Sequence, residues 1–106
     1  MNQKDHRIAV ELKEKLAGIV SLVDFRVYGS RARGDADEYS DMDVFVEVET
    51  LDDVVEEKIH HVTWETGLNN DCMVISPLVY SRYELEQTAA RSSDIVKNIF
   101  REGVRI

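Results

Sequence analysis

The sequence has little of what secreted, membrane-spanning and nucleic-acid-binding proteins require. Its single cysteine, Cys72, excludes an internal disulfide and gives no sign of an oxidising compartment. No apolar run approaches the roughly 20 residues of a membrane span, and the first residues lead into an amphipathic stretch and not into a secretory signal. The 13 basic residues are outnumbered by 21 acidic ones, so the broad basic surface of a nucleic-acid binder is missing. These absences predict a cytoplasmic protein that neither enters a membrane nor binds nucleic acid directly.

The length of the chain and the positions of its proline and glycines indicate one compact domain. The chain of 106 residues is long enough for a single hydrophobic core, and we expect residues 1–106 to form one domain. There is one proline, no internal repeat and no linker-like tract, and the five glycines fall between periodic segments. An alternation of helices and strands in one α+β unit is therefore predicted.

Hydrophobic periodicity places the elements of this unit. Apolar residues recur every three or four positions in three segments, which predicts helices at 4–18, 51–66 and from Ser92 or Ser93 to Gly103, with a weaker short helix near 81–86. Strands are predicted at 22–28, 41–48, 71–76, where Pro77 ends the run, and 104–106. In the first two strands apolar and polar residues alternate, so we expect one buried and one open face. The open face should carry Asp24, Arg26, Tyr28, Asp41, Asp43, Phe45 and Glu47.

Acidic residues are concentrated in one part of the chain. Eleven of them lie between Asp35 and Glu57, a stretch without Lys, Arg or His. A solvated acidic face explains most of them. It explains less well the pair Asp41 and Asp43, which lies inside a predicted strand.

The predicted bend at Gly29-Ser30 has the features of an anion-binding site. It joins a strand to a short helical turn, 31–33, that Gly34 ends. Glycine lets the backbone approach a ligand closely, and the free N–H groups at the start of a helix attract phosphate. By itself, a Gly-Ser pair at a turn is also an ordinary structural feature.

The carboxylates that follow suggest a divalent cation. Asp41 and Asp43 are two residues apart in a strand, so both face one way with about 6–7 Å between them along the backbone. Hard oxygen ligands suit Mg²⁺, which also takes phosphate oxygens. Asp71 opens the third predicted strand, and if that strand lies beside the second, it adds a third carboxylate that ligates metal or acts as general base. The alternatives are a solvent-exposed Asp pair and a turn residue after Asn69-Asn70.

Two arginines flank the bend. Arg31 and Arg33 offer planar, bidentate donors to a phosphate, with Arg33 the stronger candidate. The alternative is that they screen the acidic loop that follows.

Taken together, these residues resemble a known family. The pattern Gly29-Ser30, ten residues, Asp41-x-Asp43, with Arg31-Ala32-Arg33-Gly34 after the Gly-Ser pair, resembles the nucleotidyltransferase superfamily that includes DNA polymerase β. Within it, the chain is similar to the MNT (minimal nucleotidyltransferase) proteins over nearly its whole length. The resemblance implies a polymerase β-like fold, with a small mixed β-sheet, helices packed on one face and the metal site on the other.

The resemblance also implies a reaction. Two Mg²⁺ ions would be held by Asp41 and Asp43, one of them also by Asp71, while Gly29 and Ser30 bind the β- and γ-phosphates of ATP. Arg31, Arg33 and Ser40 would complete the nucleotide site. An acceptor hydroxyl would attack the α-phosphorus, and pyrophosphate would leave.

The partner expected from the resemblance is a protein. The chain has no room for the acceptor-binding second domain of larger superfamily members, and MNT proteins are commonly paired with HEPN ribonuclease toxins. There the MNT protein is the antitoxin and transfers AMP to a tyrosine of the toxin, binds the toxin, or does both. The acidic stretch would suit a basic ribonuclease. Two alternatives stay open: an antitoxin that acts by binding alone, and a nucleotidyltransferase acting on a small molecule such as an antibiotic.

Overall fold

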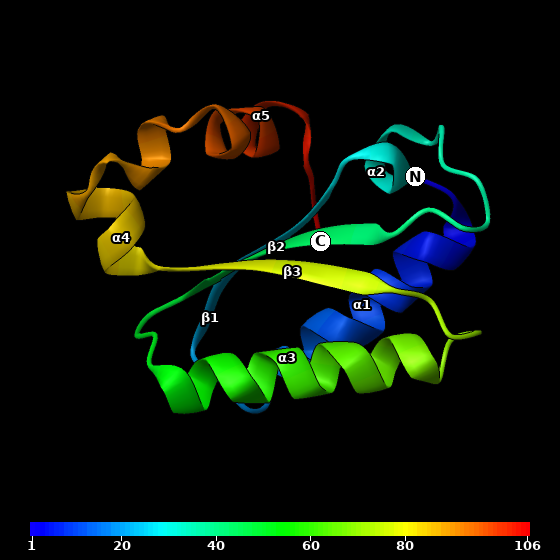
Figure 1. Ribbon diagram of the computed structural model, residues 1–106, viewed down its shortest axis with the longest axis horizontal. Coiled ribbons are helices and arrows are strands. Elements are labelled where there is room, and N and C mark those ends of the chain that lie inside the picture. Colours follow the sequence, from blue (N-terminus) through cyan, green and yellow to red (C-terminus); the bar gives the residue numbers. More distant parts are fainter.

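The computed structural model describes residues 1–106 and shows an α+β fold, as predicted (Figure 1). Two long helices, four strands and several short helices alternate along the chain. In chain order they are α1 (Gln3–Ala17), β1 (Leu22–Tyr28), α2 (Ser30–Arg33), β2 (Met42–Val48), α3 (Asp53–Leu68), β3 (Ile75–Ser81), α4 (Arg82–Gln87), the 3-10 helix η1 (Ala89–Ser92), α5 (Asp94–Glu102) and β4 (Val104–Arg105). No helix combines the length and apolar character that crossing a bilayer demands.

The four strands form one mixed sheet in the order β3-β2-β1-β4. β1 pairs antiparallel with both β2 and β4, whereas β2 and β3 are parallel. Parallel neighbours need a crossover connection, and α3 supplies it. The small mixed sheet expected for the chain is therefore confirmed.

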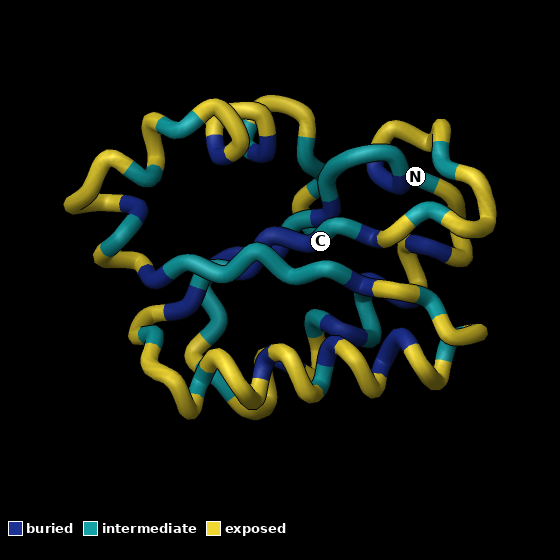
Figure 2. The backbone as a smooth tube through the Cα atoms, in the orientation of Figure 1, coloured by how far each residue is buried: buried dark blue, intermediate teal, exposed yellow.

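The main core lies between one face of this sheet and the helices α1 and α3 (Figures 1 and 2). The helices begin at the side chains of Asn2 and Asp52, each of which accepts a hydrogen bond from the backbone N–H three residues on. Thirteen buried residues make up this core, among them Ile8, Leu12, Leu16, Val27, Val44, Val46, Val48 and Ile59. The alternation in the two central strands thus predicted the buried face correctly.

A second, smaller core covers part of the other face. Phe45, predicted on the open face, is fully buried there and packs with Leu85, Val96 and Ile99 from α4 and α5. Its ring also meets Phe100 edge-on, with 5.4 Å between the ring centroids. The C-terminal helices α4 and α5 therefore cover the part of this face around Phe45.

The third strand differs from its prediction. β3 runs from Ile75 to Ser81 and contains Pro77, which we expected to end the strand. Proline lacks an N–H group but is tolerated at the edge of a sheet, and β3 is an edge strand. The residues before it form a turn in which Asp71 and Cys72 have positive φ angles of 60° and 55°. The polar residues at 69–71 therefore belong to this turn and not to the sheet.

Candidate active site

The bend at Gly29 lies directly against a carboxylate of β2. Gly29 has φ 75° and ψ −154°, a backbone conformation that essentially only glycine adopts. A Cβ atom at this position would come within 2.8 Å of Asp43 Oδ2. Because residue 29 has no side chain, the backbone before Ser30 can lie directly against the Asp43 carboxylate.

Asp43 lies on the sheet face that carries the candidate site. Its strand neighbours are Tyr28 on β1 and Ser76 on β3, whose side chains point to the same face because they are directly paired. Asp41 precedes β2 and is exposed. Of the three carboxylates predicted to lie with the Gly29 bend, the structure places Asp43 against it.

Electrostatics around Asp43 favour a cation. Partial burial, followed by the negative charge of Asp41, raises the pKa of Asp43 above its ordinary value. Burial also raises the pKa of the Tyr28 phenol, with smaller contributions from Asp43 and Tyr80. A divalent cation would relieve the repulsion between the two carboxylates, and hard oxygen donors fit Mg²⁺.

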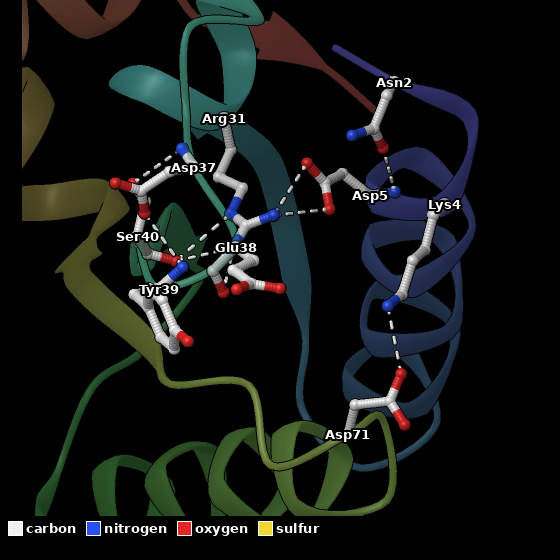
Figure 3. A network of polar contacts seen from close by, with 9 residues as sticks. All are labelled: Asn2, Lys4, Asp5, Arg31, Asp37, Glu38, Tyr39, Ser40 and Asp71. Carbon is white, nitrogen blue, oxygen red and sulfur yellow. Dashed lines mark hydrogen bonds and ion pairs between the residues drawn. The ribbon is translucent and has the colours of Figure 1, made fainter.

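Asp71 is not the third member of this group. Its side chain is 83% exposed and pairs with Lys4 on α1, with 3.0 Å between Lys4 Nζ and Asp71 Oδ2 (Figure 3). No three His, Cys, Asp or Glu side chains lie close enough together to hold a metal ion. The prediction that Asp71 faces Asp41 and Asp43 from a neighbouring strand was wrong, because β3 begins four residues later.

The position expected for that third carboxylate belongs to Ser76. In the parallel pairing of β2 with β3, Ser76 is the partner of Asp43. Ser76 was missed because the predicted strand ended at this residue. A strand placed from Ile75 through Pro77 to Ser81 would have shown Ser76 as its first polar residue.

Arg31 also differs from its prediction. It is 7% exposed, and its guanidinium pairs with Asp5 at 3.1 Å from Nη1 to Oδ1 and donates to the backbone carbonyls of Glu38 and Ser40 (Figure 3). All three donor nitrogens are thereby engaged, so the expectation that Arg31 binds the nucleotide was wrong. The Ser40 hydroxyl bonds to Asp37 within the same loop.

Arg33 remains at the bend. Its side chain is 52% exposed and pairs with Asp35 at 3.1 Å. Together with Tyr28 and Gly29, and with Asn98 and Ile99 of α5, it lines a pocket of about 200 Å³. Periodicity predicted the helix that ends at Gly103 but gave no sign that this helix would border the bend.

A mixed sheet with a glycine-serine bend packed against a central strand, which an Asp-x-Asp sequence leads into, defines a nucleotidyltransferase type of fold. The family model described as nucleotidyltransferase domain matches residues 7–105, and the chain belongs to this family. Its fold and the superfamily resemblance are thus confirmed, and a transferase is indicated. Nothing among curated proteins matches the chain.

Solved structures share the fold at low sequence identity. A chain of a toxin-antitoxin crystallised with AMP-PNP superposes with a TM-score of 0.60 at 16% identity, over 98% of this chain and 72% of that chain. A putative nucleotidyltransferase from Sulfolobus solfataricus superposes with a TM-score of 0.51 at 19% identity, over 93% of this chain and 76% of that one.

Proposed function

We propose that this protein is a Mg²⁺-dependent nucleotidyltransferase of the MNT antitoxin type. It transfers AMP from ATP to a hydroxyl, that of a tyrosine, on a HEPN ribonuclease toxin and so neutralises it. Family membership supports the reaction class. The toxin-antitoxin with AMP-PNP among the similar folds supports the partner and the nucleotide. ATP and toxin would both be met in the cytoplasm.

The observation that carries this proposal is the contact between Gly29 and Asp43. A residue with a side chain would displace the carboxylate, since the added Cβ would be 2.8 Å from Asp43 Oδ2. The backbone before Ser30 is therefore free to bind phosphate beside the carboxylates that hold the cation. Positioning and charge neutralisation of this kind supply most of the catalysis in phosphoryl-group transfer.

The residues take the following roles in the proposal. Gly29 and Ser30 bind the β- and γ-phosphates, Arg33 neutralises phosphate charge, and Asp41 with Asp43 holds Mg²⁺. Mg²⁺ held there would supply neutralisation of the negative charge on the phosphates. The tyrosine oxygen forms a bond to the α-phosphorus, the bond from that phosphorus to the β-phosphate oxygen breaks, and pyrophosphate leaves while the hydroxyl proton passes to solvent.

The donor set suits one Mg²⁺ better than two. One or two carboxylates are the usual protein share of a Mg²⁺ site, which water and phosphate oxygens complete. A second ion would need a further carboxylate ligand. The resemblance implies such a carboxylate on the neighbouring strand, but the strand partner of Asp43 is Ser76.

Transfer of label tests the proposal. The purified chain is incubated with α-³²P-labelled ATP, Mg²⁺ and the protein encoded by the adjacent gene. We expect label on that protein, released by phosphodiesterase, and none with Asp43→Asn. Asp53→Asn, an equivalent change at an exposed residue of α3, is the matched control and should transfer normally. Absence of label with the wild type, over a range of divalent ions, would refute the catalytic proposal.

One observation favours a second candidate, an antitoxin that neutralises by binding alone. The third carboxylate is missing, since Asp71 lies in a turn and Ser76 faces Asp43. In this case Asp43→Asn should still relieve growth arrest when co-expressed with the toxin, whereas the catalytic proposal requires that relief be lost.

A further inference from the structure

A buried ion pair connects the first turn of α1 with α2. Asp5 is 2% exposed and Arg31 7%. Arg31 Nη1 lies 3.1 Å from Asp5 Oδ1 and 3.3 Å from Asp5 Oδ2, so one nitrogen spans both carboxylate oxygens (Figure 3). Buried pairs of this kind often add little net stability, because removing two charges from water offsets their attraction. Stability alone therefore does not account for this pair.

The rest of the guanidinium holds the segment that leads into β2. Arg31 Nε and Nη2 donate to the Ser40 carbonyl at 3.2 and 2.8 Å, and Nη2 also lies 3.4 Å from the Glu38 carbonyl. We call residues 36–40 the strap. Ser40, at its end, immediately precedes Asp41.

The strap has no other hydrogen bond to the body of the protein. Its remaining bonds are internal and join Asp37, Tyr39 and Ser40 to one another. Most of its residues are exposed, and Tyr39 is 86% exposed. Arg31 is thus what fixes the strap relative to the sheet.

Arg31 also lies on the other side of the candidate site. Arg31 directly follows the Gly29-Ser30 bend in α2, and its buried side chain donates to the carbonyl of Ser40, the residue before Asp41. Asp5 holds that side chain in place from α1. The geometry points to Arg31 as a positioning residue, which with Asp5 fixes the Asp41 carboxylate relative to the Gly29-Ser30 bend. This inference rests on the proposed function, since it assumes that cation and nucleotide bind there.

Two variants separate positioning from simple stabilisation. Arg31→Lys keeps a positive charge for Asp5 but has no planar fork with which to hold the two carbonyls as well. Asp5→Asn removes the charge that orients the guanidinium. Glu14→Gln, at an exposed carboxylate of α1 that forms no ion pair, is the matched control.

The experiment measures binding of Mn²⁺ together with a non-hydrolysable ATP analogue, and hydrogen exchange of the strap amides, at a temperature where circular dichroism shows every variant folded. We expect Arg31→Lys and Asp5→Asn to weaken Mn²⁺ binding about 10–100-fold, the usual effect of freeing a group that orients a metal ligand. Exchange at residues 37–40 should accelerate in both variants and stay unchanged in Glu14→Gln.

The outcomes are distinguishable. If the wild type binds Mn²⁺ and analogue, and folded Arg31→Lys binds them equally well, Arg31 is merely structural and the positioning role is refuted while the proposed function stands. If the wild type binds neither, both fail. Should Asp5→Asn not fold, Arg31→Lys decides alone.

Discussion

Replacing Asp43 with asparagine should make the metal-free protein more stable while it weakens cation binding. The change keeps the shape of the side chain, so the contact with Gly29 is preserved. No hydrogen bond or ion pair stabilises the Asp43 carboxylate, and burial and Asp41 both raise its pKa, so its charged form is disfavoured in the folded state. Neutralising it therefore removes an unfavourable interaction.

The order of magnitude follows from the backbone spacing of residues 41 and 43, which is about 6–7 Å where the chain is extended. Two like charges about 6–7 Å apart repel by about 0.6 kcal/mol in water and about 2.5 kcal/mol at an effective dielectric constant of about 20. Because water reaches this pair, the lower part of that range applies, and we expect a gain of about 0.5–1 kcal/mol. For a domain of this size such a gain raises Tm by about 2–8 °C.

The stability gain of Asp43→Asn over the wild type should decrease as the pH is lowered. The folded-state pKa of Asp43 is raised, so the folded state binds more protons than the unfolded chain in the window between the ordinary value of 3.8 and the folded value. Acidification through this window stabilises the wild type relative to Asp43→Asn. The difference in Tm should be full above the folded pKa and vanish below the ordinary value.

The assay is thermal unfolding in EDTA from pH 3 to pH 8, with Asp53→Asn as the control for a general loss of negative charge. In parallel, Mn²⁺ binding by calorimetry should weaken at least about tenfold in Asp43→Asn, which corresponds to a single lost interaction of about 1.4 kcal/mol. A lower Tm at pH 7 in the variant, or undiminished Mn²⁺ binding, would show that Asp43 is a structural carboxylate and not a ligand.

Three further changes probe the site and the core. Gly29→Ala should lower the free energy of unfolding by about 1–3 kcal/mol through its positive φ, as measured by chemical denaturation. It should also weaken Mn²⁺ binding, measured by calorimetry, because the new Cβ displaces Asp43, and normal binding would contradict this displacement. Ser76→Asp should place a carboxylate beside Asp43, strengthening Mn²⁺ binding about three- to tenfold and lowering the Tm of the metal-free protein; weaker binding would mean that residue 76 does not face the site. Phe45→Ala should cost about 3–5 kcal/mol in urea unfolding, since the fully buried ring joins β2 to α4 and α5, and a loss below about 1 kcal/mol would argue against the second core.

The sequence by itself determined the local features of this protein. Alternation along β2 predicted that Val44, Val46 and Val48 are buried and that Asp43 faces the other side, because successive side chains of a strand point in opposite directions. The bend at Gly29 was equally predictable, since a glycine between a strand and a helical turn marks a conformation that other residues avoid. Such features depend on neighbours a few residues away.

Only the tertiary structure decided which residues complete the site. The register of β3 against β2 joins residues that are distant in the chain, and it brings Ser76 to Asp43 while Asp71 stays in a turn. Arg31 pairs with Asp5, which is 26 residues away in the chain and comes within reach only when α1 lies beside α2. An arginine has the same donors whether it binds phosphate or a buried carboxylate, so its role depends on which acceptor the folded chain brings within reach.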